Sequence, residues 1–230
     1  MSGSLRLALF DCDGTLVDSQ FLITESMTAA FAAHGLGAPD PAALRRLVGL
    51  PLLRAVALLR PDLDPDRRAG VAERYREAFA DLRRRGEPAE PLFPGIRDAL
   101  DALEAAGVLL GVATGKSRRG LDAVLEHHGL TSRFVTLQTA DIGPGKPHPE
   151  MVLRALAETG AAAADTVVIG DTVYDIQMAR NARVASVGVS WGYHAVAELE
   201  EAGADRIVHH GGEIAGAALG LVGRGQTEKS

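Results

Sequence analysis

Short apolar segments that end abruptly at polar residues are the feature that most constrains the fold of this chain. Four of them are rich in Val, Leu, Ile and Ala, and they lie at residues 5–10, 108–113, 166–170 and 184–189. Segments of this kind are typical of strands that are covered on both faces, as in a parallel sheet. Between them, apolar residues recur at intervals of three and four, the spacing of a helix with one buried face. The alternation predicts an α/β fold with a parallel sheet and right-handed crossovers.

The stretch from residue 17 to residue 88 interrupts this alternation. Helical spacing of apolar residues occurs four times in it, around residues 23–34, 44–48, 52–59 and 71–82, and prolines separate the repeats. No segment of the strand type occurs there. We therefore predict two domains, an all-helical unit at 17–88 that is inserted into an α/β core made of residues 1–16 and 89–230.

Composition excludes several classes of protein. The 230 residues are 47% hydrophobic and 23% charged with a single cysteine, which fits a globular chain with no internal disulfide. A formal charge of −6 argues against a nucleic-acid partner. No apolar run approaches the roughly 18 residues of a membrane helix. The opening residues show neither a basic segment nor a cleavage site, so we expect a cytoplasmic protein with no membrane partner.

Two carboxylates follow the first apolar segment directly. In the sequence DCDGT, Asp11 and Asp13 are two residues apart. On an extended backbone such residues point the same way, with α-carbons about 6.5–7 Å apart, and they lie where α/β sheets bind their ligands. Neighbouring carboxylates raise each other's pKa unless a cation sits between them. Mg²⁺, which prefers oxygen ligands, is the cation that this pair favours.

The segment at residues 166–170 is followed by a second pair of acids. In GDTVYD, Asp171 and Asp175 are four residues apart and can face one site if a helix begins there. An aspartate at a helix start can also be an ordinary N-cap. Because the pattern repeats the one at Asp11 and Asp13, a shared metal site is the favoured interpretation.

Two shorter signals lie between the acid pairs. Thr114 and Gly115 follow an apolar segment, and their hydroxyl and loop amides could hold a phosphate. The letters TGKS do not form a nucleotide P-loop, because the first glycine of that motif is missing at position 110. Lys146 lies between a glycine and two prolines in GKPHPE. The chain has only three lysines, and Lys116 and Lys146 are two of them; Lys116 could face either the phosphate or solvent.

Taken in order, these motifs resemble those of the haloacid dehalogenase superfamily, and in particular of its phosphatases with a helical cap. The resemblance rests on DCDGT at 11–15, Thr114, Lys146 in GKPHPE and GDTVYD at 170–175, a span of about 165 residues. The resemblance implies a Rossmann-like core with an inserted all-helical cap.

The resemblance also implies a role for each matching residue. Asp11 would be the nucleophile that forms an aspartyl-phosphate, and Asp13 would be the general acid and then the general base. Mg²⁺ would be held by Asp11, by the backbone carbonyl of Asp13 and by Asp171, with Asp175 in or just behind that shell. Thr114 and Gly115 would bind the phosphoryl group, and Lys146 would offset negative charge.

The implied function is a Mg²⁺-dependent phosphatase that acts on a small phosphorylated metabolite, with 2-phosphoglycolate as the favoured substrate. A sugar-phosphate mutase on the same core is the main alternative, and a non-catalytic binding module is a weaker one. Residues 191–193 could border the site, or pack in the core or at an interface. The cap-side candidates for substrate selection are Gln20, Arg45, Arg46 and Arg54.

Overall fold

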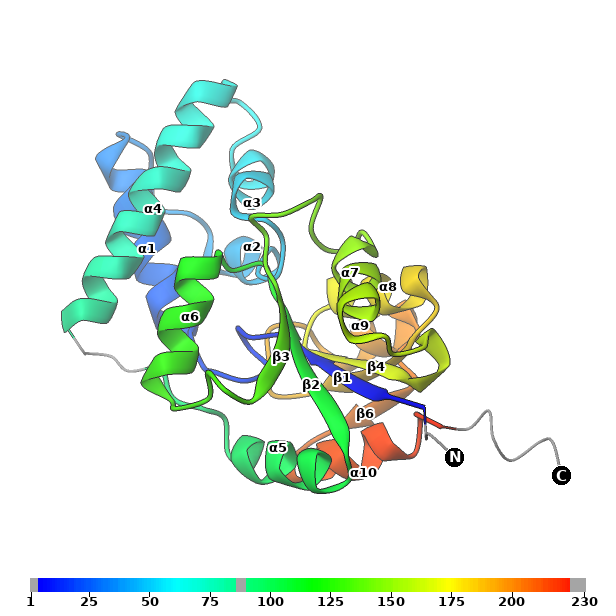
Figure 1. Cartoon of the computed structure of the whole chain (residues 1–230). Helices are drawn as coiled ribbons and strands as arrows, with labels where there is room; N and C mark the ends of the chain where they lie inside the picture. The colour runs from blue at the N-terminus through cyan, green and yellow to red at the C-terminus, as the bar shows by residue number, and fades with distance from the viewer. Residues whose placement is uncertain (1–3, 86–89, 224–230) are drawn as a thin grey trace, which may run out of the picture.

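A six-stranded parallel sheet forms the centre of the computed structural model, which describes residues 4–85 and 90–223 (Figure 1). The strand order is β3-β2-β1-β4-β5-β6, so β1 lies in the middle with β2 and β4 on its two sides. The strands are β1 (Arg6–Phe10), β2 (Val108–Ala113), β3 (Phe134–Gln138), β4 (Thr166–Gly170), β5 (Ala185–Val189) and β6 (Arg206–Val208). The predicted α/β fold with a parallel sheet is confirmed.

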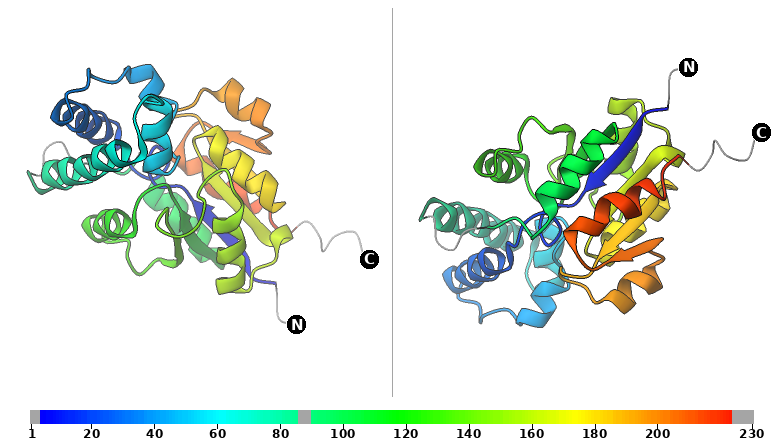
Figure 2. Two further views of the ribbon diagram at one scale, coloured as in Figure 1. Left: turned by 90° about the horizontal axis from the view of Figure 1, so that it is seen from above. Right: turned by 90° about the horizontal axis from the view of Figure 1, so that it is seen from below.

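Helices cover both faces of the sheet because successive strand residues point to opposite sides. Phe10 and its alternate neighbours pack against the first set of helices, whereas Leu7 and Leu9 pack against the second. Figure 2 shows two helices of the first set, α5 and α10, across one face. The first set comprises α5 (Ile96–Ala105), α6 (Arg118–His127) and α10 (Ile214–Leu219); the second comprises α7 (Glu150–Thr159) and α8 (Val173–Ala182).

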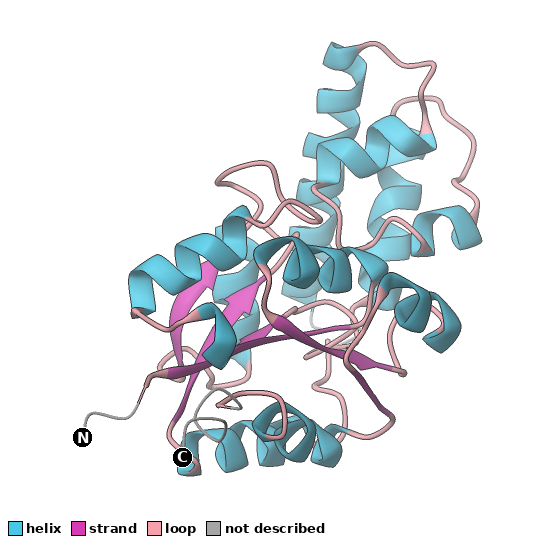
Figure 3. Cartoon of the chain, turned by 90° about the vertical axis from the view of Figure 1, so that its right-hand side faces the viewer, coloured by secondary structure: helices cyan, strands magenta, loops and turns pink. Residues whose placement is uncertain are grey.

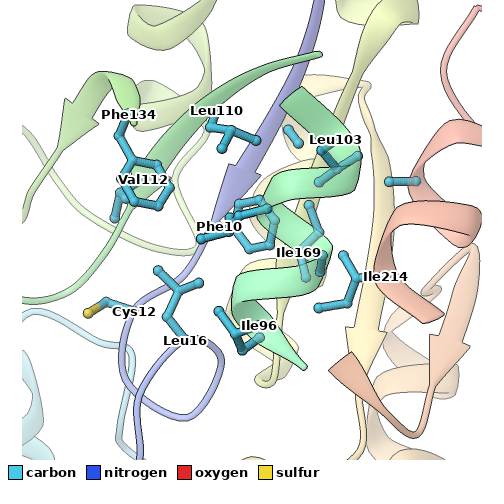
Figure 4. Close-up of a cluster of buried hydrophobic side chains, with 14 of the residues drawn as sticks. Phe10, Cys12, Leu16, Ile96, Leu103, Leu110, Val112, Phe134, Ile169 and Ile214 are labelled. Carbon is cyan, nitrogen blue, oxygen red and sulfur yellow. The ribbon is translucent and has the colours of Figure 1, made fainter. Parts of the chain in front are cut away.

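The core on the first face is a continuous apolar cluster. Phe10 and Ile169 from neighbouring strands meet Leu103 of α5 and Ile214 of α10 (Figure 4). Cys12 is fully buried in the same cluster, so its side chain belongs to the core. Helix α9 (Val196–Ala202) packs on α8 and β5, and two short 3₁₀ turns lie at Ala163–Asp165 and Gly211–Glu213.

A separate helical unit stands beyond the carboxyl ends of the strands (Figure 3). It contains α1 (Gln20–Ala33), α2 (Pro41–Arg45), α3 (Leu52–Leu59) and α4 (Pro65–Arg85), which lie between β1 and β2 in the chain. These helices share a hydrophobic cluster of their own, with Phe31, Val56 and Val71 buried in it. The inserted all-helical cap is thus present. The predicted domain boundary at residue 88 lies outside the described residues.

Among residues 4–85 and 90–223, no helix has both the length and the apolar character to span a bilayer.

Candidate active site

The order of the strands brings three of the predicted site residues together. Asp11 follows β1, Thr114 follows β2 and Asp171 follows β4, and these three strands are neighbours in the sheet. Backbone hydrogen bonds fix the strand ends, from Asp11 N to Ile169 O at 2.8 Å and from Thr114 N to Gln138 O at 2.9 Å. All three side chains are buried. The carboxyl ends of these strands therefore carry an acid, a hydroxyl and a second acid side by side.

Three carboxylates form a buried acidic cluster at the carboxyl ends of the strands. Oxygens of Asp11, Asp171 and Asp175 all lie within 4.8 Å of one another. Burial, reinforced by the neighbouring acids, raises the pKa of Asp11 to about 7 and that of Asp171 well above its usual value. Asp11 Oδ2 is buried and has no hydrogen-bond partner among the described residues. Oxygen donors in this arrangement fit a hard divalent cation.

Lys146 supplies one positive charge to the cluster. Its Nζ lies 2.7 Å from Asp11 Oδ1 and 2.6 Å from Asp175 Oδ1, and the side chain is fully buried. Burial opposes its charge, but Asp11 and Asp175 outweigh that effect, so the pKa of Lys146 is raised. One ammonium cannot balance three carboxylates, which leaves a net negative site.

Hydrogen bonds hold Asp171 and Asp175 in place. Asp171 accepts from Thr15 Oγ1 at 2.9 Å and from Tyr193 N at 2.8 Å. Asp175 Oδ2 accepts from Thr172 N at 3.1 Å and from Thr172 Oγ1 at 2.6 Å. Thr172 is the N-cap of α8 and Asp175 completes its capping box. Asp175 thus caps the helix with one oxygen and faces Lys146 with the other.

Asp13 turns away from the acidic cluster. Its Oδ1 lies 2.7 Å from Lys116 Nζ and also accepts a hydrogen bond from Ser19 Oγ. Its side chain is not one of the three grouped carboxylates, so only its backbone could join a metal site centred on them. Ser19 precedes α1 and carries no sequence signal beyond its place after the first motif.

The side chain of Lys116 faces the site rather than solvent, which favours the predicted contact with the phosphate over the solvent-facing alternative. Besides Asp13, its Nζ lies 3.5 Å from Glu90 Oε1 and 4.7 Å from the centre of the Phe79 ring. Glu90 is buried and accepts from Arg83 Nε of α4 at 2.7 Å. Sequence reasoning missed Glu90, because a lone acid beside a proline has no distinguishing pattern.

A pocket of about 260 Å³ opens above these residues. Asp11, Asp13, Thr114, Gly115 and Lys116 line it on the side of the sheet, and the helical unit lines the other side. The two parts touch at Gly115, where an added Cβ would lie 2.7 Å from Gly49 O. A phosphate placed beside Thr114 and Asp11 would thus lie between the sheet and the helices.

The four cap-side candidates do not line this pocket. Arg45 instead donates to the carbonyls of Gly192 at 2.6 Å and Tyr193 at 2.8 Å, and to Gln20 Oε1 at 3.2 Å. Arg46 pairs with Glu198 of α9 at 2.7 Å, and Arg54 is exposed. The guanidinium forks of Arg45 and Arg46 therefore join the helical unit to the core, for which their geometry is suited.

Residues 191–193 border the site. Gly192 lies so close to Asp171 that an added Cβ would be 2.2 Å from the Asp171 Cβ. Trp191 instead packs beside Phe93, with ring centroids 6.1 Å apart. Gly192 and the amide of Tyr193 therefore adjoin Asp171, whereas Trp191 belongs to the core.

Gly14 allows the first motif to turn beneath Asp171. Its φ is +85°, and an added Cβ would lie 2.3 Å from Asp171 Oδ2. We expect Gly14→Ala to lower the free energy of unfolding by about 2–3 kcal/mol or more, because strain and steric overlap combine. The matched control is Gly35→Ala, with φ of +67° but no atom within 4 Å of the added Cβ, where about 1 kcal/mol is expected. Urea denaturation checks the difference; equal losses would contradict it.

Comparisons with known proteins identify the family of the chain. Residues 8–189 match the family model for haloacid dehalogenase-like hydrolase. The chain is 37% identical to "Probable phosphatase IndB" of Dickeya dadantii (strain 3937), over 94% of each chain. It is 35% identical to a "Phosphoglycolate phosphatase" of Xylella fastidiosa (strain 9a5c), over 82% of this chain and 81% of the relative.

A solved structure extends the comparison to the fold. A "predicted phosphatase from Clostridium acetobutylicum" superimposes with a TM-score of 0.84 at 27% identity, and the match covers 95% of this chain and all of that one. Family model, relatives and fold agree, and the chain belongs to the haloacid dehalogenase-like hydrolase family.

Proposed function

We propose that this phosphatase hydrolyses a small phosphomonoester with the help of Mg²⁺ and through an aspartyl-phosphate intermediate. The observation that carries the proposal is the buried Asp11, whose Oδ2 has no partner among the described residues and whose Oδ1 faces Lys146. Asp11 also lines the pocket together with Thr114 and Gly115. A nucleophile and groups that could bind phosphate thus meet in one place.

The acidic cluster fits the proposed metal. Asp11 and Asp171 would hold Mg²⁺ together with the backbone carbonyl of Asp13, and Asp175 would stand behind them through its bonds to Thr172 and Lys146. Bound there, the ion would neutralise charge on the carboxylates and on the phosphoryl group.

The residues of the chain would share the remaining work. Asp11 would attack phosphorus while Asp13 gives a proton to the leaving oxygen, and Asp13 would then take a proton from the water that hydrolyses the aspartyl-phosphate. Thr114 Oγ1 and the amide of Gly115 would bind phosphoryl oxygens. Lys146 would offset the charge of Asp11. The helical unit at 17–88 would act as a cap that excludes water from the pocket.

For the substrate, 2-phosphoglycolate is the candidate that the name of the Xylella relative supports. A sugar-phosphate mutase on the same core would convert one sugar phosphate into its isomer without net release of phosphate, so a single assay separates the two. A non-catalytic binding module is disfavoured because all six groups, Asp11, Asp13, Thr114, Lys146, Asp171 and Asp175, are present.

Mg²⁺ tests the proposal in two ways. Phosphate release from a panel of phosphomonoesters is expected to require Mg²⁺, to fall to background with a chelator and to return when the metal is restored. Because the ion binds only the folded site, saturating Mg²⁺ is expected to stabilise the fold by about 2–3 kcal/mol at a hundred times its Kd.

The control variants are Asp171→Asn, which should remove the stabilisation, and Asp98→Asn, which changes an exposed acid on α5 and should keep it. Phosphate release that persists in the chelator would contradict the metal requirement.

A further inference from the structure

The pocket above the acidic cluster has two unlike halves. The half on the side of the sheet is polar and contains Asp11, Asp13, Thr114 and Lys116. The half on the side of the helical unit is lined mainly by aliphatic and aromatic side chains from α1, α2, α3, α4 and the segment between α2 and α3. A phosphoryl group bound in the polar half would direct its leaving group into the apolar half.

Two leucines in the apolar half have no evident role in folding. Leu47 and Leu53 line the pocket, yet neither belongs to the hydrophobic clusters of the described residues. Leu53 is half exposed, with 50% of its surface open to solvent. Because both side chains line the pocket, a ligand bound there could remove their apolar surface from water, which is favourable.

Two aromatic rings of α4 extend the same surface. Tyr75 and Phe79 both line the pocket, with centroids 5.8 Å apart and planes inclined at 44°. The hydroxyl of Tyr75 donates to or accepts from no other described residue, which leaves it available to a ligand. Flat side chains with one polar group are typical of a surface that binds a ring.

The apolar half offers little to a carboxylate. Lys116 is already paired with Asp13 and lies near Glu90, and Arg83 is paired with Glu90. Arg76 is paired with Glu73 at 2.9 Å, and Arg119, which also lines the pocket, is exposed to solvent. The carboxylate of a glycolate leaving group would thus lie among apolar side chains without a free buried cation, which is costly.

The volume of the pocket also argues against a leaving group as small as glycolate. The pocket measures about 260 Å³, whereas one water molecule needs about 10–15 Å³ of such space. A two-carbon acid would leave most of the apolar half unfilled. This inference rests on the phosphatase function proposed above but departs from 2-phosphoglycolate as its substrate. We propose that the leaving group of the substrate is a neutral alcohol that carries a ring and packs against Leu47, Tyr75 and Phe79.

Three phosphomonoesters of simple alcohols separate size from charge. Ethyl phosphate is small and neutral at its alcohol end, 2-phosphoglycolate is small and anionic, and benzyl phosphate is neutral and carries a ring. We expect kcat/KM for benzyl phosphate to exceed the other two values by about tenfold or more, the discrimination that a hydrophobic pocket provides. A value for 2-phosphoglycolate that equals or exceeds that for benzyl phosphate would overturn the proposal.

A charge placed in the pocket tests the position of the ring. Leu47→Arg is expected to lower the ratio of kcat/KM for benzyl phosphate over 2-phosphoglycolate by about tenfold, because it removes apolar surface and adds a cation. Leu58→Arg is the matched control, since Leu58 is exposed on α3 and does not line the pocket. An unchanged ratio in Leu47→Arg would place the leaving group elsewhere and overturn the proposal.

Binding without turnover separates this proposal from the function on which it rests. In 2-phenylethylphosphonate and 3-phosphonopropionate, carbon replaces the bridging oxygen of benzyl phosphate and of 2-phosphoglycolate. Calorimetry with Mg²⁺ present is expected to give the phenyl compound a Kd at least about tenfold lower. That preference without hydrolysis of any ester would refute the phosphatase function and support the ring pocket. Hydrolysis with a preference for the acid would support the function and refute the ring pocket.

Discussion

Asp11→Asn is expected to lower kcat for phosphate release by about 10⁴-fold or more, the scale of loss when a nucleophile is removed. The substitution keeps the size of the side chain, but an amide is a far weaker nucleophile than a carboxylate. Asp11 faces Lys146 at 2.7 Å and lines the pocket, which Asp171 and Asp175 do not. Asp13 also lines the pocket, but its Oδ1 is paired with Lys116. The measurement is kcat with saturating Mg²⁺ and the best ester of the panel.

The fold of the Asp11→Asn variant should survive. Burial, together with repulsion between the acids, raises the pKa of Asp11 and of Asp171, and the neutral amide relieves part of both costs. Urea denaturation without metal should therefore show unchanged or greater stability. Asp98→Asn should leave activity unchanged and cost less than about 1 kcal/mol, because Asp98 lies in the first turn of α5. Activity above about a tenth of the original in Asp11→Asn would rule out Asp11 as the nucleophile.

Central strands were easier to predict from the sequence than edge strands. The segments at β1, β2, β4 and β5 are buried on both faces, so they are apolar throughout and stand out. Strand β3 at the sheet edge alternates buried and exposed residues and includes Thr136 and Gln138, while β6 has three residues. Neither was predicted, because a short edge strand covered on one face carries little hydrophobic signal.

The site likewise contains residues that the sequence predicts and contacts that it does not. Asp11, Thr114, Asp171 and Asp175 lie at strand ends or the next helix start, so motif spacing was enough to predict that they meet. The contacts of Lys116 with Asp13 and with Glu90 join segments far apart in the chain. Their pairing depends on how the helical unit sits on the core, and no local pattern in the sequence encodes that.

Lys146→Met is expected to lower the free energy of unfolding by about 3–5 kcal/mol in the absence of metal, the cost of removing one partner from a buried ion pair. Lys146 is fully buried and contacts Asp11 at 2.7 Å and Asp175 at 2.6 Å. Methionine fills a similar volume, so the loss measures the charge rather than a cavity. Urea denaturation in a chelator is the measurement.

An exposed ion pair supplies the control for Lys146. Arg118 pairs with Asp122 at 2.8 Å, but the two side chains are 58% and 49% exposed, so Arg118→Met should cost less than about 1 kcal/mol. If Lys146→Met alone fails to fold, adding Asp175→Asn removes one of the unpaired acids and should recover part of the stability. Equal losses in Lys146→Met and Arg118→Met would show that the acids of the cluster do not need this ammonium. A double variant no more stable than Lys146→Met would show that Asp175 is not the acid that depends on it.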